Sequence, residues 1–163
     1  MIRKRRPTFR TRFYFLLCLL CPLLFCQNTL AQVEAKNYLD LVTRAETQVQ
    51  AKQWRNAAKV LEEIVRQNPV DGRFWHHLGT SYYNVKDYRQ AVLAFRKSYE
   101  LGFDNPANTA YNIACNYALL SEKDSALRWL EKAFSLGFSD LKQAQTERPI
   151  ASLFEKRRRK LLV

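Results

Sequence analysis

The chain has 163 residues, of which 47% are hydrophobic and 13% aromatic, and its formal net charge is +12. A chain of this length and apolar content can form one packed domain of ordinary size. Only 4 glycines and 5 prolines are present, too few for a collagen-like chain, a low-complexity linker or an all-β sandwich with its frequent turns. The composition therefore predicts a mostly helical domain.

Residues 1–31 have the composition of a secretory signal peptide. Six arginine and lysine residues precede residue 13 without any acid, and an uncharged apolar run of 14 residues follows. The small residues Thr29 and Ala31 then stand where a signal peptidase requires them. We therefore expect export, to the periplasm or as a secreted protein, with cleavage after Ala31. An uncleaved membrane anchor is the alternative, although a spanning helix usually needs about 20 apolar residues.

The rest of the chain, residues 32–163, has little charge asymmetry outside its C-terminal end. It holds 21 basic and 15 acidic side chains, and five of the basic ones form the run 156–160. Such a body does not predict nucleic-acid binding. Cys115 is its only cysteine, so an internal disulfide is excluded and stability must come from packing. We expect Cys115 to be a buried structural thiol.

Residues 72–106 contain two helix-forming segments joined by a turn. Two sets of residues recur there at helical spacing: Trp75, Leu78 and Tyr82 in the first half, and Ala91, Phe95 and Ser98 in the second. The turn between Asn84 and Asp87 makes the two segments antiparallel, and the second helix is expected from Tyr88 to about Leu101. One such hairpin cannot bury its apolar face alone, so it needs neighbours.

Related segments lie about 34 residues earlier and 35 residues later in the chain. Their equivalent positions hold Leu41, Ala45, Ala57, Leu61, Ile64 and Pro69 in the earlier copy, and Ala110, Ile113, Ala114, Tyr117, Ala126, Leu130 and Ala133 in the later one. The chain therefore contains three units of about 38–71, 72–106 and 107–138. Self-similarity with this period is typical of solenoids.

The second unit resembles the tetratricopeptide repeat. It carries the family's pattern as Trp75, Leu78, Gly79 and Tyr82, followed by Ala91 and Phe95. The resemblance covers about three-fifths of the chain and implies an all-α, right-handed solenoid of three helix-turn-helix hairpins. The chain departs from the family at Ala110, which replaces the Trp, and at the polar residues Arg44 and Gln48.

Residues 139–163 follow the third unit and are expected to form capping helices and a basic tail. Pro149 suits the first turn of a last helix, and Ile150 begins its apolar edge. In the turns that close the second and third units, Gly102 and Gly137 are expected to end their helices in the left-handed conformation.

Little in the sequence predicts catalysis. His76 and His77 are adjacent, so they diverge by about 100° around a helix and do not face one metal ion together. No phosphate loop, nucleophile elbow or zinc-protease motif is present. An enzymatic hypothesis would rest on Cys115 or His76 alone, and we expect no enzyme, no metal and no cofactor.

The family resemblance implies a protein-binding role. In tetratricopeptide-repeat proteins, the first helix of each unit lines a concave groove that holds an extended peptide or a partner helix. Carried onto this chain, the partner-binding residues are Arg73, His76, Thr80, Tyr83, Asn84, Asn108, Tyr111 and Asn112, with Cys115, Val42 and Glu46 at further groove positions. We expect a non-enzymatic adaptor or scaffold. The same polar side chains could instead serve only to keep the groove soluble.

One family activity is not expected here. Chaperone-binding members clamp a C-terminal carboxylate with a Lys and an Asn in their first repeat, and those positions would fall at Val42 and Glu46.

The basic tail supports an alternative hypothesis. Its run consists of Lys156, Arg157, Arg158, Arg159 and Lys160. It can be the solvated end of the last helix, where basic charge complements the helix dipole. It can instead hold an envelope-associated structural protein to an anionic membrane or cell-wall surface. Nucleic acid is the least expected partner of an exported chain.

Overall fold

The computed structural model describes residues 32–103, 105–140 and 150–152. The predicted signal peptide, most of the predicted capping segment and the basic run 156–160 lie outside these residues. The chain divides into two compact units with a boundary after Asp40, which falls inside a helical stretch of residues 32–50. Everything below concerns the second unit.

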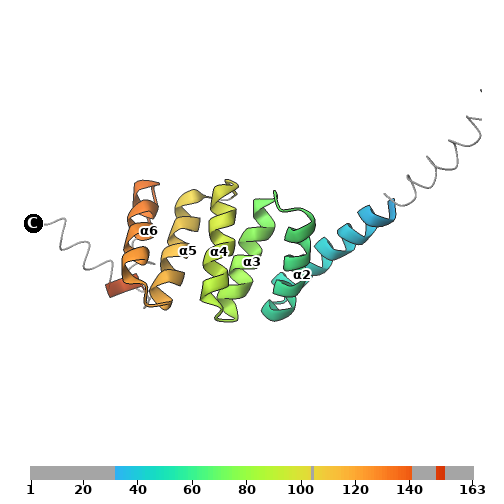
Figure 1. The fold of residues 1–163 in the computed structure, drawn as a ribbon, viewed down its shortest axis with the longest axis horizontal. Coiled ribbons are helices and arrows are strands. Elements are labelled where there is room, and N and C mark those ends of the chain that lie inside the picture. The colour runs from blue at the N-terminus through green and yellow to red at the C-terminus, as the bar shows by residue number, and fades with distance from the viewer. Residues whose placement is uncertain (1–31, 104, 141–149, 153–163) are drawn as a thin grey trace, which may run out of the picture. The chain divides into compact units, whose positions relative to one another are not determined.

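All regular structure in the described residues is helical (Figure 1). The main helices are α2 (Trp54–Gln67), α3 (Gly72–Asn84), α4 (Tyr88–Glu100), α5 (Pro106–Leu119) and α6 (Lys123–Ser135). Among the helices described, none combines the length and apolar character needed to cross a membrane.

Short polar side chains begin three of the helices. Asp71, Asp87 and Asn105 cap α3, α4 and α5, and each accepts a hydrogen bond from a backbone N–H of the first turn, at 3.0, 3.2 and 2.9 Å. Such caps satisfy N–H groups that have no partner within the helix. Pro106 then occupies the first turn of α5, where its missing N–H does no harm. The second helix expected from Tyr88 to about Leu101 is confirmed as α4.

The turns repeat with the period of the sequence. Lys52, Lys86 and Ser121 follow the first helix of their units and have φ angles of 55, 67 and 63°. The left-handed conformation is unusual for residues with a Cβ, so these turns use it without the glycine that would have indicated it. After α4 and α6, Gly102 and Gly137 have φ angles of 69 and 93°, which confirms the left-handed helix ends predicted for them.

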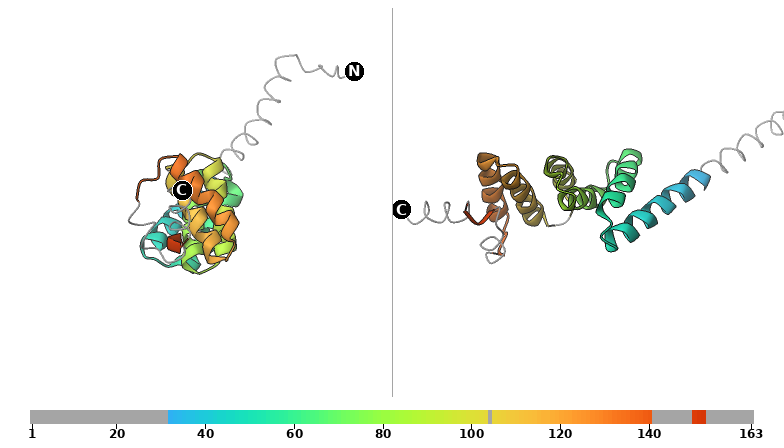
Figure 2. Two further views of the ribbon diagram at one scale, coloured as in Figure 1. Left: turned by 90° about the vertical axis from the view of Figure 1, so that its left-hand side faces the viewer. Right: turned by 90° about the horizontal axis from the view of Figure 1, so that it is seen from below.

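Each helix packs on the next one along the chain, from α2 through α6. The helices form consecutive antiparallel hairpins, and Figure 2 shows them from two further directions. The predicted all-α solenoid of helical hairpins is therefore confirmed.

Two polar contacts join the first repeat unit (38–71) to the second (72–106). The Trp75 indole donates a hydrogen bond from Nε1 to the carbonyl oxygen of Pro69 at 2.8 Å. The Tyr82 hydroxyl donates to Oε1 of Glu62 at 2.6 Å. Burial and then this hydrogen bond raise the pKa of the Tyr82 phenol well above its usual value. Two aromatic residues of α3 therefore bind the preceding unit through their polar ends as well as their rings.

A buried cluster closes the third hairpin. Its members are Ala107, Ala110, Tyr111, Ala114, Cys115, Ala126, Leu130, Ala133, Phe138 and Ile150. Ile150 belongs to the helical residues 150–152 and is 0% exposed. The described part of the predicted capping segment therefore packs on the third hairpin.

Candidate binding pocket

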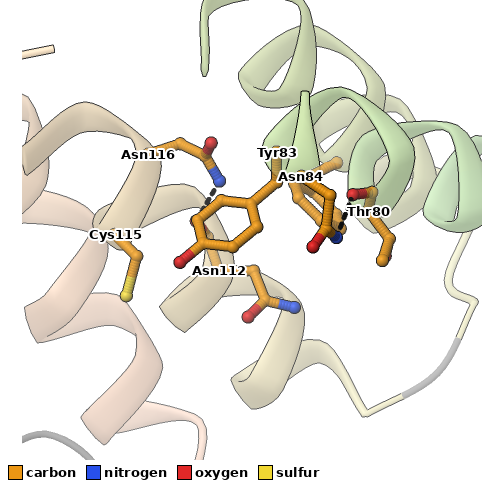
Figure 3. Close-up of a pocket in the computed structure, with 7 residues that line it drawn as sticks. Thr80, Tyr83, Asn84, Asn112, Cys115 and Asn116 are labelled. Carbon is orange, nitrogen blue, oxygen red and sulfur yellow. Dashed lines mark hydrogen bonds between the residues drawn. The ribbon is translucent and has the colours of Figure 1, made fainter. Parts of the chain in front are cut away.

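A pocket with a volume of about 240 Å³ lies between α3 and α5 (Figure 3). Its lining consists of Thr80, Tyr83, Asn84, Phe95, Asn112, Cys115 and Asn116. Thr80, Tyr83, Asn84 and Asn112 were all predicted as groove residues, and the structure brings them together. They meet because each lies on the first helix of its unit, and α4 supplies only Phe95. Among the described residues, the lining contains polar and aromatic side chains but no charged one.

Three of the polar side chains bond to the backbone of their own helix. Each donates to a carbonyl oxygen one turn earlier: Thr80 Oγ1 to His76 at 3.0 Å, Asn84 Nδ2 to Thr80 at 2.8 Å, and Asn116 Nδ2 to Asn112 at 2.8 Å. Such bonds hold each carboxamide with its nitrogen toward the helix backbone and its oxygen on the other side. The pocket is therefore bordered by acceptor oxygens in fixed orientations.

Part of the hydrogen-bonding capacity of this lining is unused within the described chain. Asn116 is 1% exposed, and its buried Oδ1 has no hydrogen-bond partner among the described residues. A buried acceptor without a partner costs about 1–3 kcal/mol. Asn112 is half-buried, and the structure described gives its carboxamide no hydrogen bond.

Tyr83 and Cys115 contribute very different surfaces. Tyr83 is 39% exposed, and Figure 3 shows its ring projecting from α3 toward the α5 side of the pocket. Its ring centroid lies 6.0 Å from that of Tyr88. Cys115 is buried, which confirms its expected place in the packing between helices.

Arg73 lies outside the pocket lining and is held by acidic neighbours. Its guanidinium is 3.3 Å from Oε1 of Glu46 and 3.6 Å from Oδ2 of Asp71, and it lies 4.4 Å from the centre of the Phe74 ring. These side chains are partly exposed, so each ion pair contributes at most about 1 kcal/mol to stability. Two groove positions, Glu46 and Arg73, therefore neutralise each other.

The rings of the two adjacent histidines lie edge to face, with centroids 6.2 Å apart. The ring of His76 packs against Phe95 and Phe103 with centroid distances of 5.4 and 5.7 Å. Burial, with a smaller effect of the Arg73 charge, lowers the pKa of His77, and Glu46 and Asp71 oppose that shift. The described residues bring no three His, Cys, Asp or Glu side chains together as metal ligands.

Tyr111 requires a correction. It was expected to line the groove, but it is 1% exposed and stacks on Phe138 with ring centroids 4.3 Å apart. The Phe138 ring from the turn after α6 covers it, so Tyr111 offers no surface to a partner. Asn108 is exposed in the first turn of α5 and lies outside the pocket lining.

Asn116 is the pocket residue that sequence reasoning missed. Its equivalent 35 residues earlier is Ser81, which is also buried and donates a hydrogen bond to the carbonyl oxygen of the residue one turn before, at 2.8 Å. The sequence did contain a signal for this residue, because Asn116 replaces the smaller Ser81 at the equivalent position of the preceding repeat unit. The serine has one polar atom, its hydroxyl oxygen, whereas the larger asparagine side chain has a carbonyl oxygen in addition to the nitrogen that makes this bond.

Comparison with known proteins agrees with this architecture. The family model described as tetratricopeptide repeat matches residues 72–105, the α3–α4 hairpin. No curated protein sequence matches the chain.

Several solved structures share the fold. The Yersinia enterocolitica type III secretion chaperone SycD, in complex with a peptide of the translocator YopD, has a TM-score of 0.59 at 19% identity, over 74% of this chain and 92% of that one. PcrH in complex with the chaperone binding region of PopD has a TM-score of 0.58 at 20% identity, over 73% and 91%. The TPR2B domain of yeast Sti1 in its pHsp70 complex has a TM-score of 0.56 at 19% identity, over 76% and 97%. At these identities the likeness is one of fold.

Proposed function

We propose that this chain, which contains a tetratricopeptide repeat at residues 72–105, is a non-enzymatic adaptor that binds a segment of a partner protein along the first helices of its units. The pocket between α3 and α5 carries this proposal, because Thr80, Asn84 and Asn112 offer hydrogen bonds there beside the ring of Tyr83. The structures of the same fold are complexes: SycD with a peptide of YopD, PcrH with the chaperone binding region of PopD, and the Sti1 TPR2B domain with pHsp70. They support a partner of the same kind.

The chemistry of the pocket suits a polypeptide. An extended segment presents backbone N–H and C=O groups, and asparagine carboxamides can both donate to and accept from them. Tyrosine adds a rigid aromatic surface of the kind enriched at binding hot spots. The volume of about 240 Å³ is below the roughly 300–1,000 Å³ of ordinary small-molecule sites. The pocket would hold one side chain of a segment whose remainder lies outside it.

Site-specific cross-linking in the native cells tests the adaptor proposal. We expect a photo-cross-linking amino acid in place of Tyr83 to capture a partner that the same amino acid at Arg128, exposed on α6, does not capture. On the Tyr83 background, Asn112→Ala should lower the yield severalfold. Asn56→Ala, the same change at an exposed position of α2 that was not predicted to bind a partner, should not.

Two outcomes contradict the proposal: no partner captured from position 83, or the same partners captured from positions 83 and 128. The alternative of a structural protein held by the run 156–160 predicts that Asn112→Ala has no effect on what is captured. Loss of capture when this run is neutralised would favour that alternative.

We also propose that the adaptor acts outside the cytoplasm, on the strength of the sequence of residues 1–31. N-terminal sequencing of the protein isolated from its native cells should give Gln32 as the first residue. A mature chain that retains residues 1–31 would instead favour the membrane-anchor alternative.

A further inference from the structure

We propose that the pocket selects a neutral carboxamide, the side chain of an asparagine or glutamine within the partner's chain, over a carboxylate or a cation. This inference rests on the proposed function and names the chemistry that the same site would recognise. It depends on three features of the lining: its lack of charge, the orientation of its polar groups and the unused capacity of two asparagines.

The absence of charge in the lining disfavours an ionic occupant. An ion that leaves water loses its hydration and needs an opposite charge nearby to recover the loss. The lining supplies none. Arg73, the cation at a neighbouring groove position, is already paired with Glu46 and Asp71 at 3.3 and 3.6 Å. A carboxylate therefore finds no available counter-charge, and neither does an ammonium group.

The orientation of the polar groups further disfavours a carboxylate. Thr80, Asn84 and Asn116 each direct a donor to the backbone of their own helix. Asn84 and Asn116 each keep a second N–H, but the oxygen atoms of all three side chains remain as acceptors, which a carboxylate cannot use because it has no donor. An occupant that donates matches this border.

Asn112 distinguishes a carboxamide from an ammonium group. Its own carboxamide has no hydrogen bond within the described chain, so it has both a donor and an acceptor to offer. Two carboxamides can pair through two hydrogen bonds, N–H to oxygen in each direction. An ammonium group has no acceptor for the N–H of Asn112, whereas asparagine and glutamine side chains have both halves.

Asn116 independently indicates a donor. Its Oδ1 is buried without a partner, in a side chain that is 1% exposed and lines the pocket. The oxygen has almost no accessible surface, so an N–H group recovers this unmade hydrogen bond only if the side chains over the oxygen move aside. The pocket volume of about 240 Å³ equals that of about eight water molecules at roughly 30 Å³ each, room for one polar side chain.

Three small probes of four carbon atoms each test the preference without a known partner. Butyramide, butyrate and butylammonium are titrated into the full chain, and the side-chain amide signals of Asn112 and Asn116 are followed by nuclear magnetic resonance. We expect butyramide to shift these signals and to saturate at a concentration roughly threefold to tenfold lower than either ion, the ratio that one net hydrogen bond gives. An ion that saturates as early as butyramide overturns the inference, and so does the absence of any shift with butyramide.

A charge substitution sharpens the test. Asn112→Asp keeps the side-chain shape but removes the donor and adds a negative charge, while the backbone carbonyl that Asn116 uses remains. We expect the preference to move to butylammonium. Asn56→Asp, at an exposed position of α2 outside the pocket lining, should leave the order of the three probes unchanged. A retained butyramide preference in Asn112→Asp overturns the role assigned to Asn112.

The two proposals fail separately. Capture of a partner from position 83 together with tighter binding of butyrate would support the adaptor proposal and contradict the proposed carboxamide preference. A clear butyramide preference without any captured partner would support the proposed pocket chemistry and contradict the adaptor proposal.

Discussion

The second and third hairpins place different residues at the same positions, 35 residues apart. In the second hairpin, His76 lies 5.7 Å from Phe103, and its ring is partly exposed. In the third, Tyr111 stacks on Phe138 at 4.3 Å and is buried. The same position is therefore partly exposed in one unit and buried in the next. A Phe follows in the turn of both units, and the closer stacking on Phe138 accompanies the burial.

The contact between the two helices of a hairpin differs in the same way. In the second hairpin Gly79 faces Phe95, and a Cβ added to Gly79 would lie 2.8 Å from the ring. The third hairpin has Ala114 and Leu130 at the equivalent positions, both in its buried cluster. The second hairpin thus fills the space between its helices with the smallest residue, Gly79, and the large Phe95. The third hairpin fills the equivalent space with Ala114 and Leu130, which differ less in size. What repeats is the volume that each pair fills.

Removal of the Phe138 ring should have the largest effect. Phe138→Ala uncovers Tyr111 and leaves a cavity, so we expect the free energy of unfolding to fall by about 3–5 kcal/mol. Phe103→Ala should cost less, about 1–2 kcal/mol, because Phe103 is only partly buried. Urea denaturation followed by circular dichroism measures both. Equal losses in the two variants would contradict the asymmetry between the hairpins.

A methyl group at Gly79 should have the next largest effect. Gly79→Ala forces the new Cβ against the Phe95 ring, and overpacking of this kind costs about 1–3 kcal/mol. Phe95→Leu, combined with it, recreates the residues of the third hairpin and should recover part of the loss. A double-mutant cycle of unfolding free energies isolates this coupling. Purely additive losses would show that the two residues do not compete for space.

The helical hairpins and the meeting of four pocket residues follow directly from the sequence, because residues at equivalent positions of successive units share a face. The burial of Tyr111 does not follow from this periodicity, which gives His76 and Tyr111 the same register. It depends on how closely the Phe138 ring stacks, a contact that spacing alone does not specify. Periodicity also misled at Asn116, because its equivalent in the second unit, Ser81, is a buried serine and so indicated a core position.

The loss of one inter-unit hydrogen bond should have a smaller effect. Tyr82→Phe removes the hydroxyl that donates to Glu62 at 2.6 Å, and we expect a loss of about 1 kcal/mol in unfolding free energy. The equivalent Tyr117 of the third hairpin has no hydrogen-bond partner for its hydroxyl within the described residues. Tyr117→Phe is therefore the matched control and should change stability by much less. Similar losses in both variants would assign the effect to the ring environment instead.

The smallest effect should be a pH dependence that belongs to the second hairpin alone. Burial, and less strongly Arg73, lowers the pKa of His77 below its usual 6.5, and Glu46 and Asp71 do not fully offset this. Between the lowered pKa and 6.5, the unfolded chain binds more protons than the folded one, so the free energy of unfolding falls as the pH falls through that window. His77→Asn introduces the residue of the third hairpin, Asn112, and should flatten this part of the stability profile.

The measurement is urea denaturation at a series of pH values for the wild type and His77→Asn. The two stability curves should run parallel above pH 6.5 and converge or cross below it, because only the wild type loses stability by protonation of His77. A difference that stays constant across this range would show that His77 is as easily protonated in the fold as in the unfolded chain. Its burial would then have no electrostatic consequence.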